Sequence, residues 1–230
     1  MMKRTFDLAT SPVRELNQAL HDCLGDAPLS HWQVLNPKGE HAIACGIDTQ
    51  AEVQIQGHVG YYCAGMNKQG RVTIEGNAGT GVAENMMSGL VRVKGNASQS
   101  SGASGHGGLL VIEGNAAARC GISLKGLDIV VQGSVGHLSG FMAQQGCLII
   151  CGDAGHALGD SLYEARIFLK GRVEDLGADC VRKEMTPKHL EMLAALLEKA
   201  AVNEDAANFR RYGSARELYN FDIDNADAHG

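Results

Sequence analysis

Two histidines and an aspartate are the residues of this chain whose types and spacing could build a chemical site. His137, His156 and Asp175 follow one another at intervals of 19 residues, and imidazole nitrogens and carboxylate oxygens are ligands that zinc takes in proteins. If the chain stacks once per interval, side chains about 5 Å apart could share a metal, which makes an independent β-helix enzyme one hypothesis. Three donors along one edge close a tetrahedral shell poorly, so we favour the interpretation that these are stacked surface side chains.

A second segment, residues 76–81, has the glycine content of a phosphate-binding loop. Its sequence is Gly-Asn-Ala-Gly-Thr-Gly, but no helical pattern follows it and the same bend recurs along the chain. A phosphate-binding loop of this kind leads into a helix N-terminus. The sequence therefore disfavours phosphate binding at this segment.

The cysteines give no sign of a redox or metal centre. They are odd in number, form no Cys-x-x-Cys pair and are scattered, at Cys23, Cys45, Cys63, Cys120, Cys147, Cys151 and Cys180. This usage is typical of free thiols in a reducing compartment. The chain also lacks a Gly-x-Ser-x-Gly elbow and a paired arrangement of carboxylates. We therefore predict no catalytic residue and no cofactor in this chain.

Composition excludes several classes of protein. The chain has 230 residues and a net charge of −6, and no basic stripe marks a nucleic-acid surface. It has no apolar run of 18 residues, and its start, Met-Met-Lys-Arg-Thr-Phe-Asp, is not that of a signal peptide. A cytoplasmic location is the expectation that follows from these features.

The elements that must position any site are set by a repeat. A glycine recurs every 19 residues without insertion or deletion, at Gly57, Gly76, Gly95, Gly114, Gly133, Gly152 and Gly171. Constant spacing over seven units predicts a stacked repeat architecture. The residue after each glycine is polar in every unit (His58, Asn77, Asn96, Asn115, Ser134, Asp153 and Arg172). We interpret this column as residues that tolerate a tight or left-handed bend.

The columns before each glycine indicate one strand per unit. The positions two and four residues before it are aliphatic in all seven units, as the buried side of a strand requires. One strand per 19 residues cannot form hairpins, but it can stack in parallel on the next unit. The sequence therefore predicts an all-β fold, a parallel β-helix of about seven coils over residues 40–183.

An outward column, three residues before the glycine, changes from polar to apolar along the chain. It reads Gln54, Thr73 and Arg92, and then Val111, Val130, Ile149 and Phe168. An apolar stripe of this length should be covered, either by the chain's own C-terminal helix or by another protein chain. The cationic and aromatic segment Phe209, Arg210, Arg211 and Tyr212 also suits a partner surface. We predict that these eight apolar, cationic and aromatic residues form the partner surface.

The two ends of the chain are expected to be helical. Residues 1–39 should contain a helix over 11–24 capped by Ser11, and short strands at 32–35 and 41–45 should form an imperfect first coil. Residues 184–230 should contain a helix that begins at Thr186 and Pro187, ends near residue 201 and carries a leucine stripe. A tail over 208–221 and a frayed end over 222–230 complete the expected organisation.

The glycine bends carry a family resemblance. Segments 76–81, 87–97 and 107–116 resemble the GXGXG repeats found in the last domain of the large chain of glutamate synthase and in one component of formylmethanofuran dehydrogenase. The resemblance covers roughly residues 40–180 and implies a right-handed β-helix without catalytic residues of its own. In glutamate synthase this domain holds the glutaminase and the flavin-binding synthase domains together.

The resemblance also implies a function for a chain in which the repeats stand alone. It suggests the GXGXG subunit of N-methylglutamate synthase, whose complex converts methylamine and glutamate to N-methylglutamate and ammonia. The implied partners are a class II amidotransferase-like subunit and an FMN-binding glutamate synthase-like subunit. FMN and iron–sulfur clusters would be in the partner. The formylmethanofuran dehydrogenase component and the independent β-helix enzyme remain the alternatives.

Overall fold

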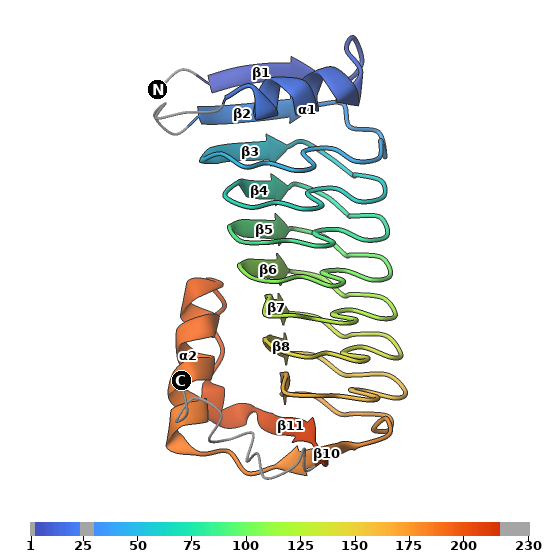
Figure 1. The fold of residues 1–230 in the computed structure, drawn as a ribbon, viewed down its shortest axis with the longest axis vertical. Coiled ribbons are helices and arrows are strands. Elements are labelled where there is room, and N and C mark those ends of the chain that lie inside the picture. Colours follow the sequence, from blue (N-terminus) through green and yellow to red (C-terminus); the bar gives the residue numbers. More distant parts are fainter. Residues whose placement is uncertain (1–2, 24–29, 217–230) are drawn as a thin grey trace.

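The chain winds into a parallel β-helix of about seven turns, as the repeat predicts, and it is right-handed, as the family resemblance implies. A computed structural model describes residues 3–23 and 30–216 (Figure 1). Its central strands are β3 (Ala51–Ile55), β4 (Arg71–Ile74), β5 (Leu90–Val93), β6 (Leu109–Ile112), β7 (Asp128–Val131), β8 (Cys147–Ile150) and β9 (Arg166–Leu169). Each pairs in parallel with the next, and Gln54, Thr73, Arg92 and Val111 are partners in register. One coil therefore lies on the next after a shift of one repeat.

The interior of the coils is filled by aliphatic side chains. The residues two and four positions before each marker glycine point inward, and Ile55, Ile74, Val93 and Ile112 are each 0% exposed. They belong to one apolar cluster that runs the length of the β-helix. The prediction that the β-branched columns form the core is confirmed, and burial of these stacked side chains is the main stabilising contribution.

A ladder of side-chain hydrogen bonds follows the marker glycines. Asn77 Oδ1 accepts from the backbone N–H of Asn96 at 2.8 Å, Asn96 from Asn115 at 2.8 Å, and Asn115 from Ser134 at 2.8 Å. The column residues do not have positive φ, so of the tight or left-handed bend expected of them the left-handed alternative is wrong. Their polar side chains satisfy the N–H of the same position one coil further on, and backbone groups left unpaired there would be costly.

The N-terminal end is closed by a helix, and two strands precede the first of the seven coils. Strands β1 (Lys3–Asp7) and β2 (Ser30–Leu35) continue the parallel sheet above β3. Helix α1 (Val13–His21) places Leu16 and Leu20, both 0% exposed, against the core. Its N-cap is Pro12 rather than Ser11, and residues 41–45 form turns rather than the predicted strand.

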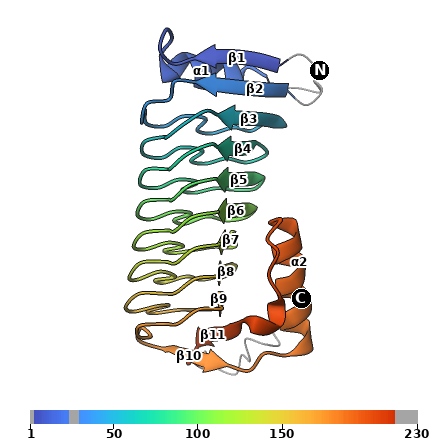
Figure 2. The same ribbon diagram turned by 180° about the vertical axis from the view of Figure 1, so that it is seen from behind.

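At the other end the chain turns back and covers its own sheet. Helix α2 (Pro187–Lys199) begins after Thr186, as predicted, and lies alongside the lower strands (Figure 2). A short 3-10 helix, η1 (Ala206–Asn208), leads into β11 (Arg210–Ser214). Strand β11 pairs antiparallel with both β9 and β10 (Cys180–Lys183), so it lies between them in the sheet. The frayed end predicted for 222–230 lies outside the described residues.

This arrangement corrects the predicted partner surface. Val111, Val130, Ile149 and Phe168 are each 0% exposed, because α2 and the residues after it cover them. Phe209 joins the same cluster, and Arg210, Arg211 and Tyr212 lie in β11 as part of the sheet. The stripe is therefore covered by the chain's own C-terminal segment, which was the intramolecular alternative. Among the described residues, neither helix has the length and apolar character that crossing a membrane requires.

Candidate functional site

The predicted histidine and aspartate column does not converge on one point. His156 pairs with Glu174 (Nε2 to Oε1, 2.7 Å) and with Asp175 (Nδ1 to Oδ2, 3.3 Å), and all three side chains are more than half exposed. A hydrogen bond from the Ala157 backbone N–H, followed by His156, lowers the pKa of Asp175. His137 takes no part in this cluster. Within the described part of the chain, no three His, Cys, Asp or Glu side chains are grouped so that they could hold a metal.

The glycine-rich bend at residues 76–81 has few N–H groups to offer a phosphate. The backbone N–H of Ala78 donates to Asn96 O at 2.9 Å, that of Gly79 to Val59 O at 3.0 Å and that of Gly81 to Gln99 O at 2.9 Å. The N–H of Asn77 donates to His58 Nδ1 at 2.9 Å. Because neighbouring coils take these donors, they cannot cradle an anion as a phosphate loop does.

The cysteines are all described and all free. Burial raises the pKa of Cys120, Cys147 and Cys180 to about 12 and that of Cys151 to about 11. Burial also raises the pKa of Cys45, and that of Cys63 well above its usual value. A thiol must ionise to act as a nucleophile or metal ligand, so these six side chains are poorly suited to either role at neutral pH.

One partly buried carboxylate lies on a strand beside the apolar cluster beneath α2. Asp128, on β7, accepts a hydrogen bond from the Cys147 backbone N–H at 3.0 Å, and its carboxylate is close enough to Lys199 for an electrostatic interaction. Burial raises the pKa of Asp128 despite the hydrogen bond and the nearby lysine. The folded protein therefore disfavours the ionised form of this group.

This raised pKa predicts how stability changes with pH. The unfolded chain ionises Asp128 near pH 4, below the pKa in the folded state, so its contribution declines as pH rises through that window. Asp128→Asn keeps an acceptor for Cys147, and we expect it to be more stable than the original chain at pH 7, with the gap closing toward pH 4. Urea unfolding at several pH values measures this difference.

A matched variant, Asp48→Asn, is expected to change stability at neutral pH in the opposite direction. Lys68 and Gln69 lower the pKa of the exposed Asp48, so Asp48→Asn is expected to lose stability relative to the original chain above pH 4 and to match it in acid. A pH-independent effect of Asp128→Asn would contradict the assignment of the raised pKa to this group.

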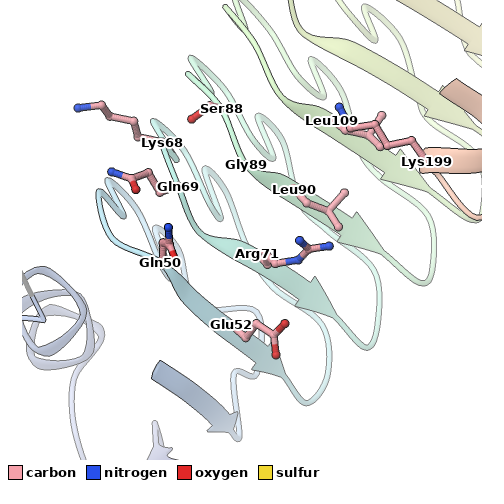
Figure 3. Close-up of a pocket in the computed structure, with 10 residues that line it drawn as sticks. All are labelled: Gln50, Glu52, Lys68, Gln69, Arg71, Ser88, Gly89, Leu90, Leu109 and Lys199. Carbon is pink, nitrogen blue, oxygen red and sulfur yellow. The ribbon is translucent and has the colours of Figure 1, made fainter. Parts of the chain in front are cut away.

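The outer face of the sheet forms an open groove above the level of α2. Two adjoining hollows of about 560 and 660 Å³ lie over β2 to β6, and both are lined by Glu52, Arg71 and Leu90. Figure 3 shows Arg71 and Leu90 on neighbouring strands between Glu52 and Lys199, the last residue of α2. Polar residues of the outward columns form its floor, and the end of the helix forms one wall.

An ion network fixes the end of α2 to this groove. Arg92 Nη2 donates to the carbonyl oxygen of Ala200, just beyond the helix, at 2.6 Å. Arg92 Nη1 and Lys94 Nζ also lie 3.0 and 3.2 Å from Glu113 Oε1. A cation at a helix C-terminus is favoured by the helix dipole, so Arg92 anchors α2 where the covered half of the sheet ends.

The groove corresponds to the polar part of the outward column, three residues before each marker glycine, and not to the part predicted as a partner surface. The polar part of the outward column, Gln54, Thr73 and Arg92, is the part that stays open. The apolar part, which we predicted as the partner surface, is the part that is covered. The position of α2 decides which part of the column is covered and which part stays open.

Fold and surface together define a β-helix repeat protein with an open charged groove on its sheet. The chain belongs to the family of Protein GlxC from Rhizobium meliloti (strain 1021). It is 61% identical to that protein over 225 residues, which is 97% of this chain and 99% of the relative. No family model matches the chain, and no solved structure gives a significant match. The relative's name states no reaction, ligand or partner.

Proposed function

We propose that this chain is a non-catalytic scaffold subunit of a glutamate synthase-like complex. The observation that carries the proposal is the unbroken stack of GXGXG coils, which resembles the β-helix domain that joins the catalytic domains of glutamate synthase. A stack held by parallel backbone pairing and a continuous core is a stiff spacer, and its long surface suits the attachment of larger partners. The partners are a class II amidotransferase-like subunit and an FMN-binding synthase-like subunit.

The narrower proposal concerns the reaction of the complex. We propose N-methylglutamate synthase, which forms N-methylglutamate and ammonia from methylamine and glutamate. FMN and the iron–sulfur clusters belong to the synthase-like subunit. This chain contributes position, because a rigid β-helix keeps the two attached subunits at a constant separation. The expected location is cytoplasmic.

Reconstitution with the two sister subunits of the host tests both levels of the proposal. The chain is co-expressed with each subunit separately and with both, and the complexes are isolated through a tag on this chain. We expect a stable ternary complex that contains FMN and iron and forms N-methylglutamate from methylamine and glutamate. A chain that stays alone with both subunits present would overturn the scaffold proposal.

A different result separates the reaction from the scaffold. A ternary complex that makes glutamate from glutamine and 2-oxoglutarate, but no N-methylglutamate, would overturn the narrower proposal and retain the scaffold. Omission of this chain serves as the control in each assay, and its absence should abolish co-purification of the other two subunits with each other.

A further inference from the structure

The chain covers only half of the outer face of its sheet. Helix α2 and the residues up to Phe209 pack on the lower strands, where they bury Leu109, Val111 and Phe168. The helix ends at Lys199, at the level where Arg92 on β5 reaches the carbonyl of Ala200 (Figures 1 and 2). Above this level the groove over β3 to β5 has no cover from the described residues.

The open half has an excess of positive charge. Five lysine and arginine side chains line the two hollows against two acidic ones, in a chain whose net charge is −6: Lys68, Arg71, Arg92, Lys94 and Lys199, against Glu52 and Glu75. A concave surface on which one sign of charge predominates attracts groups of the opposite sign.

Most of these charges are already paired, which singles out two of them. Lys68 pairs with Asp48 at 3.0 Å, and Arg92 and Lys94 share Glu113. Arg71 and Lys199 form no ion pair with any residue in the described ranges 3–23 and 30–216, and Lys199 interacts with Asp128 only at longer range. Both side chains are exposed, and they come from different elements, β4 and α2, on two sides of the same hollow (Figure 3).

An apolar strip joins this groove to the surface that α2 already covers. Leu90 is partly buried and packs against the apolar cluster beneath α2, and it also lines both hollows. Leu109, one coil further on, borders the first hollow but is only 1% exposed. An amphipathic segment lying above the end of α2 would therefore meet the aliphatic side chain of Leu90 next to two cations.

We propose that the groove over β3 to β5 receives an acidic amphipathic segment of a partner protein, whose carboxylates pair with Arg71 and Lys199 and whose apolar side chains contact Leu90. Guanidinium groups match carboxylates in a bidentate geometry, and partial burial in a groove strengthens such pairs. The inference rests on the proposed scaffold function and names the surface and the chemistry by which one sister subunit attaches.

Charge substitution in the full chain tests the proposal. The double variant Arg71→Glu with Lys199→Gln is compared with Arg119→Glu with Lys125→Gln, which makes the same change in net charge at two exposed sites outside the groove. Each protein is titrated against the FMN-binding subunit and against the amidotransferase-like subunit. We expect the groove variant to weaken binding to one subunit by at least about tenfold, and the control variant to change it by less than about twofold.

The comparison separates failure of this inference from failure of the scaffold proposal. Binding of the original chain to neither subunit would overturn both. Normal binding of the groove variant to both subunits would overturn the groove alone. Because Lys199 ends a helix, the thermal midpoint of each variant is recorded, and binding is measured where the folded fractions agree.

Photo-crosslinking identifies the segment in the groove without disturbing its charges. A photoreactive phenylalanine derivative replaces Thr73 on the groove floor, and the same residue at Ser123 on the turns of another coil is the control. We expect crosslinks from residue 73 to a partner peptide that contains at least two Asp or Glu residues beside aliphatic ones. A crosslinked peptide with a net positive charge, or no crosslink in a complex that forms, would contradict the proposal.

Discussion

Replacing Gly133 by alanine is expected to lower the stability of this protein by about 2–3 kcal/mol, the upper part of the range for overpacking a close contact. A Cβ at this position would lie 2.6 Å from the carbonyl oxygen and 2.8 Å from the carbonyl carbon of Gly114 in the preceding coil. It would also collide with the Asn115 side chain that accepts from the Ser134 N–H. Backbone atoms cannot move aside as a side chain can, so the two coils must separate locally. Thermal unfolding measures the loss, which corresponds to a fall of about 4–12 °C.

Gly213→Ala provides the matched control. Its added Cβ would meet its nearest neighbour, Lys183 Cγ, at 3.4 Å, an ordinary contact within the same sheet. We expect its stability to change by less than about 1 kcal/mol. If the two alanine variants unfolded at the same temperature, the stacking contact between marker glycines would not be the reason for their spacing.

Replacing Phe168 by alanine is expected to cost about 3–5 kcal/mol, the range for truncating a buried aromatic side chain. Phe168 is 0% exposed and belongs to the cluster formed by the outer face of the sheet with Leu193 and Leu197 of α2. The cavity would lie between the sheet and the helix, so α2 should loosen first. Urea unfolding gives the total loss, and hydrogen exchange of the α2 amides locates it.

The experiment must use the isolated chain. In that condition only α2, and not another protein chain, can cover the apolar outward column that contains Phe168. If α2 is the cover, the loss appears without any partner present. Phe141→Ala, at a partly exposed turn position, is the control and should cost less. A Phe168→Ala chain as stable as the original, with unchanged exchange in α2, would show that the helix does not pack there in solution.

The repeat made most of the fold predictable. Every marker glycine has an aliphatic pair before it, and the strands that hold Val53, Val72 and Val91 appear where that pattern places them. Period and side-chain alternation are local properties, so they can be read from sequence. The helix after Thr186 was predictable for the same reason, because its leucine stripe and N-terminal proline are local signals.

The features that the sequence did not reveal depend on long-range contacts. Whether Val130 and Phe168 face a helix of the same chain or another protein depends on the direction in which the chain leaves β10. Nothing near Tyr212 shows that its strand will pair antiparallel between two others. The groove around Arg71 was missed as a consequence, since it is defined by where α2 stops. The polar column after the glycines is visible in the sequence. Its hydrogen bonds could not be predicted, because they depend on the distance between adjacent coils.

The reversed strand at the end of the sheet has a consequence for solubility. A parallel stack with a bare last rung could template another molecule and grow into a fibril, as cross-β assemblies do. Here β11 is inserted against the direction of the coils and displaces the stacked last rung, so the outermost strand is β10 rather than β9. Strand β10 is only four residues long and contains Arg182 and Lys183. An incoming copy would find a short edge that carries two like charges, which opposes end-to-end growth.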